Sequence, residues 1–406
     1  MLALLLGGCG APASEDASSS EAVSSSADAS ASAGETEDAD GLTAQEASDA
    51  DASGVHLSKD VERYLSTLTI EQKVAQLFII TPEALTGVGE VVQAGDATKG
   101  AIEEHPVGGI ILFSQNLIDP GQTKEMLSNI QGFSYDAVGL PMLCAIDEEG
   151  GTVARVASDP AFGVEDVGDA RSIGETGDVR KAADAAGTIA AYLKELGFNL
   201  DFAPDADIVI DPATDSLGTR SFGSDPDLVG GMVASEVRAF GEAGVLSTAK
   251  HFPGIGGTGG TDSHVESITS TKTLEELEQC ELVPFQEAIA AGVDFVMVGH
   301  LLLPNVTDDD LPASLDPVVI GYLRETMGYD GVIITDSLSM EAAQVYAPDE
   351  IGVRVIEAGA DMILMPEDFE AAYQGVLDAI ESGELSEERM DESLRRVLNA
   401  KVRLMD

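Results

Sequence analysis

Eight short apolar runs between residues 75 and 366 constrain the fold of this chain more than any other feature. Most of them are apolar over four to six residues, which is typical of parallel strands that are buried on both faces. We therefore interpret all eight as strands of one sheet. Their ranges are 75–80, 108–113, 141–147, 199–208, 245–252, 294–300, 331–336 and 361–366.

Stretches with a helical pattern separate these runs. The clearest covers 179–197, and 226–244 and 274–292 are similar; each ends near a glycine, which suits a left-handed C-terminal cap. Strands that alternate with helices predict an α/β fold, a (β/α)8 TIM-type barrel forming a single catalytic domain over 55–406. An open doubly wound sheet is the alternative, but no GxGxxG motif follows the first strand.

The chain before residue 55 has a different character. Residues 1–9 end in Gly-Gly-Cys after six apolar residues, which resembles a lipoprotein signal remnant, and we expect Cys9 to be lipidated. An ordinary secretory signal is the alternative, and the run is too short for a transmembrane helix. Residues 10–54 contain eleven acidic residues and no Lys or Arg. This Ser/Ala-rich composition predicts a disordered, acidic tether.

The net charge limits the partners of the chain. With 21 Lys and Arg against 73 Asp and Glu, the formal charge is −52. A polyanion of this size repels nucleic acid and anionic membrane surfaces. We expect no nucleic-acid partner, and a membrane contact only through the lipid anchor, on the extracellular face. We also expect a monomer.

Two cysteines remain in the predicted barrel. Cys144 and Cys280 would be able to form a disulfide in an exported protein, but each lies in an apolar context. Buried free thiols are the favoured interpretation.

Polar side chains end five of the eight predicted strands. In a barrel, the carboxyl ends of the strands meet on one face, where catalysis occurs. Ionisable residues often mark strand exits, but that explains one or two such positions better than five. The residues are Asp147, Asp205, Asp207, Lys250, His251, His300 and Asp336.

The segment 248–267 gathers Lys250, His251, Asp262 and His264 around glycines. A histidine both donates and accepts a proton near neutral pH, and a nearby carboxylate orients its ring. Asp-x-His spacing alone is weak evidence, because such pairs also occur in ordinary loops. Asp336, after an apolar strand, suits a nucleophile or a base, although a helix N-cap aspartate explains it too.

Two other chemistries compete with this interpretation. His251, His264 and Asp336 have suitable ligand atoms for a metal, but Lys250 beside them repels a cation, and the first strand carries no histidine. No G-x-S-x-G motif for a serine nucleophile occurs. We expect neither a metal nor another cofactor.

Eight motifs in order resemble the family 3 glycoside hydrolases, specifically their bacterial β-N-acetylglucosaminidase branch. The resemblance covers roughly 60–406 and implies a (β/α)8 barrel. The motifs are IDEEGGTVAR, NLDFAPDADI, RSFGSDP, KHFPGIGGTGGTDSH, MVGHL, LPASL, GVIITDSLSM and AGADMILMP.

The resemblance also implies roles for individual residues. Asp336 would be the nucleophile of a retaining exo-β-N-acetylglucosaminidase, and His264, paired with Asp262, the general acid/base, which modifies the usual two-carboxylate scheme. The substrates would be peptidoglycan fragments or related amino-sugar glycans. The implied sugar-binding residues are Asp147, Arg155, Arg220, Lys250 and His251.

The sequence departs from the family pattern at three points, one of which is a glycine-rich loop one residue longer than in some relatives. Ile255 stands where a second histidine is usual, and Glu148 stands where glutamine is common. None of Asp336, Asp262 and His264 is altered. The alternatives are a β-N-acetylglucosaminide phosphorylase, since a histidine acid/base leaves less negative charge near an incoming phosphate, a β-glucosidase, or an inactive surface glycan-binding lipoprotein.

Overall fold

A computed structural model describes residues 59–257, 268–308 and 310–405. Four predictions lie outside these residues: the lipidation of Cys9, the tether over 10–54, and the roles of Asp262 and His264.

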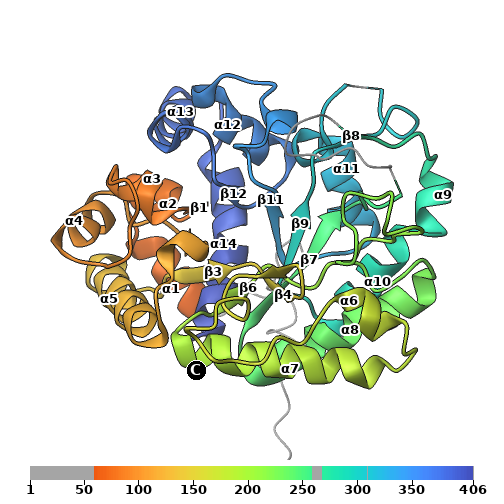
Figure 1. The fold of residues 1–406 in the computed structure, drawn as a ribbon. Helices are drawn as coiled ribbons and strands as arrows, with labels where there is room; N and C mark the ends of the chain where they lie inside the picture. Colours follow the sequence, from red (N-terminus) through yellow and green to blue (C-terminus); the bar gives the residue numbers. More distant parts are fainter. Residues whose placement is uncertain (1–58, 258–267, 309, 406) are drawn as a thin grey trace, which may run out of the picture. The chain divides into compact units, whose positions relative to one another are not determined.

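Eight parallel strands form the central sheet (Figure 1), and each of the eight predicted runs contains one of them. Hydrogen-bonded neighbours follow one another from β1 to β11 in chain order, and β12 returns to pair with β1. A bridge between Ile334 and Met362 joins β11 to β12 and closes the ring. The predicted (β/α)8 barrel is confirmed. Its strands are β1 (Phe78–Ile80), β2 (Gly109–Ile111), β3 (Leu143–Ile146), β6 (Leu200–Asp201), β7 (Leu246–Phe252), β9 (Phe295–Val298), β11 (Val332–Thr335) and β12 (Ile363–Leu364).

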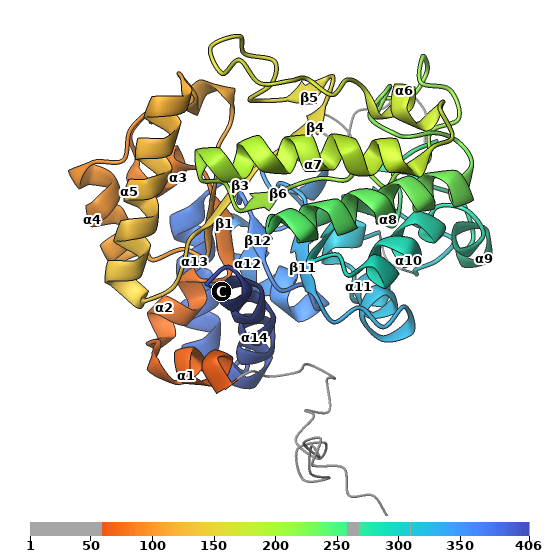
Figure 2. The same cartoon turned by 90° about the horizontal axis from the view of Figure 1, so that it is seen from below.

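Helices surround the sheet, and Figure 2 shows two of the longest, α7 and α8, side by side. The described α-helices are α1 (Lys59–Thr67), α2 (Ile70–Ala75), α3 (Pro82–Thr86), α4 (Asp96–Glu104), α5 (Pro120–Val138), α6 (Ala170–Gly174), α7 (Val179–Leu196), α8 (Pro226–Ala243), α9 (Leu274–Glu278), α10 (Leu282–Ala291), α11 (Pro317–Gly321), α12 (Pro348–Ala358), α13 (Phe369–Ser382) and α14 (Glu387–Arg403). Two short strand pairs lie outside the barrel: β4 (Glu148–Gly150) with β5 (Val153–Ala154), and β8 (Ile268–Thr269) with β10 (Leu301–Leu302).

The helix predictions are confirmed at 179–197 and 226–244, where Gly197 and Gly244 adopt the expected left-handed conformation. The single helix predicted over 274–292 is wrong, because the chain forms α9 and α10 there. Pro284 is the third residue of α10. A proline has no amide hydrogen, and only the first turn of a helix tolerates that loss, so a new helix begins just before it.

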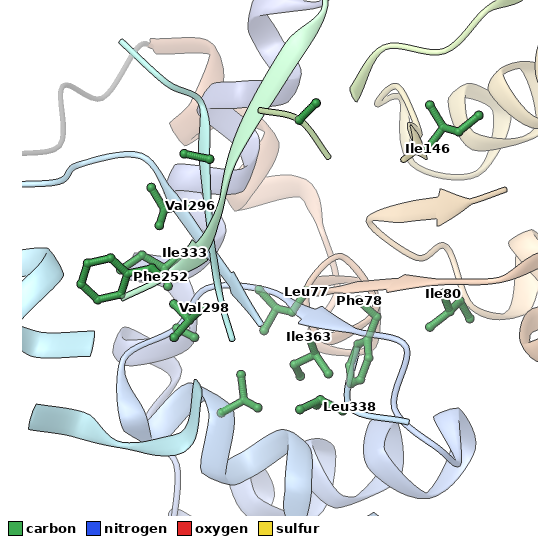
Figure 3. Packing of buried hydrophobic residues seen from close by; sticks show 14 of the residues in the cluster. Leu77, Phe78, Ile80, Ile146, Phe252, Val296, Val298, Ile333, Leu338 and Ile363 are labelled. Atoms are coloured by element: carbon green, nitrogen blue, oxygen red, sulfur yellow. The ribbon is translucent and has the colours of Figure 1, made fainter. Parts of the chain in front are cut away.

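Buried side chains alternate between the two faces of the barrel strands. On β9, Phe295 and Met297 belong to the cluster inside the barrel. Val296 and Val298, which Figure 3 labels, belong to the outer cluster that packs against the helices. The interior cluster also contains Val397 and Ala400 of α14. This helix therefore closes the amino end of the barrel and leaves the carboxyl end for a site.

Neither described cysteine forms a disulfide. Cys144 is buried, as predicted, and burial raises the pKa of its thiol to about 12. The prediction of a buried thiol is wrong for Cys280, which is partly exposed between α9 and α10. Within the described ranges, no helix has the length and apolarity needed to cross a membrane.

Shortening a buried side chain of α14 should destabilise the barrel. Leu398 is fully buried, whereas its neighbour Asn399 is exposed. We expect Leu398→Ala to lower the free energy of unfolding by about 2–5 kcal/mol and Asn399→Ala to change it by less than about 0.5 kcal/mol. Urea unfolding followed by far-UV circular dichroism measures both. Equal effects would contradict the burial of Leu398 in the core between the barrel and its helices.

Candidate active site

A cavity of about 460 Å³ lies at the carboxyl end of the barrel. Ile111, Phe202 and Met297 of the barrel interior give it an apolar part. Its volume suits a small-molecule ligand. The charged or ionisable lining residues are Asp147, Glu149, Arg155, Arg220, Lys250, His251 and Asp336.

Five of these side chains form a series of ion pairs, which we name the charge chain: Arg155, Asp147, Lys250, Glu149 and Arg220. Lys250 Nζ lies 2.9 Å from Asp147 Oδ1 and 2.6 Å from Glu149 Oε1. Glu149 also accepts two hydrogen bonds of 2.8 Å from Arg220. Arg155 Nη2 lies 3.9 Å from Asp147 Oδ2. Positive and negative groups therefore alternate along the cavity.

The charge chain keeps its buried members ionised. Burial alone would raise the pKa of Glu149. The charges of Arg220 and Lys250 lower that pKa by more than burial raises it, so that it lies well below its usual range. Burial alone would lower the pKa of Lys250. The carboxylates of Asp147 and Glu149 raise that pKa by more than burial lowers it, so that it lies above its usual range. Both groups are charged at neutral pH, and the cavity presents fixed donors and acceptors that suit the hydroxyl groups of a sugar.

Glu149 joins Lys250 to Arg220 in the charge chain, and it was not among the site residues predicted from the sequence. The available signal was its place in the IDEEGG motif, directly after a predicted strand. Alternate residues of an extended segment point to opposite sides. Asp147 and Glu149 accordingly face the cavity, whereas Glu148 points away and is fully buried.

Glu148 holds the segment that carries Arg155. Its carboxylate accepts hydrogen bonds from the amides of Val156 and Ala157, at 2.8 and 2.9 Å, and from the hydroxyl of Tyr192 at 2.8 Å. Glu148, which stands where the sequence comparison expected a glutamine, thus accepts hydrogen bonds from three donors. It does not line the cavity.

Asp207 organises the turn after β7. Its Oδ2 atom accepts from the ring Nδ1 of His251 at 2.8 Å and from the amide of the same residue at 3.1 Å. Its Oδ1 atom accepts from the amide of Ile255 at 2.6 Å. Burial lowers the pKa of His251, but Asp207 raises it more, and the net shift is upward. Asp207 therefore fixes the ring of His251 and the start of the glycine-rich loop.

Asp336 follows β11 and lines the cavity. Its amide donates to the carbonyl of Val298 at 2.8 Å, and its Oδ1 atom accepts from the amide of Ser337 at 2.7 Å. Burial raises the pKa of Asp336, but His251 and His300, with help from Lys250, lower it below its ordinary value. The carboxylate is therefore ionised at neutral pH, as a nucleophile must be.

Asp205, Asp207 and His251 bring potential metal-ligand atoms within 4.8 Å of one another. Both oxygens of Asp207 already accept hydrogen bonds, and Arg220 Nη2 lies 3.6 Å from Asp205 Oδ2. Both oxygens of Asp207 are therefore engaged by protein groups, and a guanidinium lies beside Asp205.

All five predicted sugar-binding residues and Asp336 come together around the cavity. Asp205 and Asp207 lie behind it, beneath Arg220 and His251, and His300 lies behind Asp336. The proton-transfer residues predicted from the sequence, Asp262 and His264, lie outside the described residues. The first described segment ends at Gly257, two residues after Ile255, which lines the cavity.

Comparison with known proteins gives a consistent match. The glycosyl hydrolase family 3 N-terminal domain matches residues 69–400. The beta-hexosaminidase LpqI of Mycobacterium tuberculosis is 32% identical over 345 residues, which cover 82% of this chain and 83% of the relative. Beta-hexosaminidase A of Pseudoalteromonas piscicida is 31% identical over 334 residues, which cover 75% of this chain. The match spans about half of that relative, 54% of its length.

Among solved structures, a family 3 β-N-acetylglucosaminidase from Paenibacillus sp. FPU-7 superposes with a TM-score of 0.78 at 41% sequence identity. The match covers 84% of this chain and 63% of that structure. The M. tuberculosis LpqI structure superposes with a TM-score of 0.73 at 31% identity, covering 85% of this chain and 97% of that structure.

Asp205 should make stability depend on pH. Burial and the neighbouring Asp207 raise the pKa of Asp205 to about 7, against an ordinary value of 3.8. The folded state therefore binds this proton more tightly, and the contribution of Asp205 to stability is complete below about pH 4 and is lost as the pH rises through about 7. Relative to wild type, Asp205→Asn should gain roughly 1–4 kcal/mol in unfolding free energy between pH 4 and pH 8. Urea unfolding at both pH values measures this, and a pH-independent difference would contradict it.

Proposed function

The chain belongs to glycosyl hydrolase family 3, and we propose that it is a retaining exo-β-N-acetylglucosaminidase. The observation that carries the proposal is the placement of the ionised Asp336 carboxylate and the charge chain around one cavity at the carboxyl end of the barrel. The hexosaminidase names of the relatives support the choice of an amino sugar.

In the proposed reaction, the charge chain and His251 hold the terminal sugar. Lys250 and Arg220 donate to its hydroxyl groups, and the carboxylates of Asp147 and Glu149 accept from them. Asp336 attacks the anomeric carbon and forms a glycosyl-enzyme, while the glycosidic oxygen receives a proton and leaves. Water then attacks from the face that the aglycone has left, and the β configuration is retained.

The family resemblance supports His264, paired with Asp262, as the group that protonates the leaving oxygen and later deprotonates the water. A histidine suits this role because its imidazolium donates the proton and becomes a neutral ring, which then accepts a proton from the water. It adds no negative charge of its own, whereas Asp147, Glu149 and Asp336 already place three carboxylates around the cavity. A further carboxylate acid would add repulsion beside the ionised nucleophile.

Replacing the nucleophile should abolish turnover. We expect Asp336→Ala to lower kcat on 4-nitrophenyl β-N-acetylglucosaminide by about 10³-fold or more, because no other carboxylate takes its place in the turn after β11. Glu341→Gln, an exposed position on the same segment, is the control and should keep wild-type kcat. Release of 4-nitrophenol measures both.

The substrate panel separates the competing functions. Cleavage of the β-N-acetylglucosaminide without cleavage of the β-glucoside supports the proposal, and the reverse result indicates a β-glucosidase. Turnover that requires phosphate and yields a sugar 1-phosphate indicates a phosphorylase. Folded wild-type protein that binds the sugar without turnover indicates a glycan-binding protein.

We also propose that the enzyme is held on the extracellular face of the cell membrane through lipidated Cys9 and acts on peptidoglycan fragments. The Gly-Gly-Cys sequence after six apolar residues and the acidic stretch over 10–54 support the anchor. In a bacterial host, wild-type protein should incorporate labelled fatty acid and partition with membranes, whereas Cys9→Ala should do neither. Equal labelling of both proteins would contradict the anchor.

A further inference from the structure

His300 is a buried histidine that the proposed sugar contacts do not include. It lies two residues beyond the end of β9 and is 1% exposed. Its ring bridges two segments that are far apart in the sequence. Nδ1 lies 2.7 Å from the hydroxyl of Ser314, and Nε2 lies 2.9 Å from the carbonyl oxygen of Ser337.

The chemistry of these partners determines where the ring carries a proton. A carbonyl oxygen only accepts hydrogen bonds, so Nε2 of His300 must be the donor to Ser337. A hydroxyl group either donates or accepts, so Ser314 satisfies Nδ1 in either state. The bond to Ser337 therefore depends on the Nε2 proton alone.

The bond to Ser337 acts on the turn that carries Asp336. The amide of Ser337 donates to Asp336 Oδ1 at 2.7 Å, and the carbonyl of Ser337 also accepts from the amide of Met340 at 3.1 Å. The amide of Asp336 donates to the carbonyl of Val298, in β9. The carboxyl end of β9 thus holds this turn at two points, the Val298 carbonyl and the His300 ring.

We propose that His300 is a positioning residue for Asp336: its Nε2–H bond fixes Ser337, whose amide then sets the orientation of the attacking carboxylate. The proposal rests on the function proposed above. Orientation matters because the carboxylate must meet the anomeric carbon in line with the leaving oxygen, and a displacement of about 1 Å can cost about 10²-fold in rate.

The electrostatics of the site agree with this role. Burial raises the pKa of Asp336, and His300 is, after His251, the group that most lowers it. A ring placed for packing alone has no need of a bond to the residue that follows the nucleophile. The competing explanation is a core histidine whose hydrogen bonds with Ser314 and Ser337 serve stability only.

Two substitutions separate these explanations. The amide nitrogen of glutamine reaches approximately the position of Nε2, whereas that of asparagine reaches approximately the position of Nδ1. His300→Gln therefore keeps the donor to Ser337, whereas His300→Asn keeps the contact with Ser314 and loses the donor to Ser337. Ser314→Ala removes the other partner and leaves the Nε2 bond.

We expect His300→Asn to lower kcat on 4-nitrophenyl β-N-acetylglucosaminide by about 10–100-fold with KM changed less than about threefold. His300→Gln and Ser314→Ala should stay within about fivefold of wild type. Thermal midpoints by circular dichroism accompany the kinetics. Equal kcat for the Asn and Gln variants, or losses of kcat that follow the loss of thermal midpoint, would overturn the proposal.

A second measurement does not depend on activity. The chain has five histidines, so ring ¹⁵N NMR of histidine-labelled protein is tractable, and the signal of His300 is the one missing from His300→Gln. A protonated Nε2 supports the bond to Ser337, and an unprotonated Nε2 overturns it. If the wild type fails to cleave the substrate, the proposed function fails, while the NMR result still decides whether His300 donates to Ser337.

Discussion

Burial of the Lys250 ammonium group is the constraint on which the site depends. A charge removed from water costs several kcal/mol unless opposite charges and hydrogen bonds compensate it. Asp147 and Glu149 provide that compensation at 2.9 and 2.6 Å. Glu149 is itself buried and is also balanced by Arg220. Each charge is therefore tolerated because of its neighbours, and the charge chain acts as one unit.

The barrel makes this unit possible. Asp147 follows β3, Lys250 belongs to β7, and Arg220 lies in the long connection between β6 and α8. Parallel strands bring these separate parts of the chain to one end, and α14 fills the other end with apolar side chains. Two residues behind the cavity support its lining. Asp207 fixes the ring of His251, and His300 contacts Ser337, which follows Asp336.

Much of this arrangement was predictable from the sequence. The eight apolar runs predicted the barrel because fully buried parallel strands need continuous apolar segments, and the residues ending these strands predicted the cavity. The division of 274–292 into α9 and α10 was missed because the apolar periodicity outweighed the signal of Pro284. Glu149 and the contact of His300 with Ser337 were missed because pairing across distant segments depends on three-dimensional positions that periodicity does not encode.

The most direct test of the account is the kinetic effect of Glu149→Gln. This substitution keeps the shape of the side chain but removes the charge that balances Lys250 and Arg220. If the charge chain positions the sugar, kcat/KM on 4-nitrophenyl β-N-acetylglucosaminide should fall by about 10²-fold while the circular dichroism spectrum stays that of the wild type. An unchanged kcat/KM in the folded variant would contradict the account.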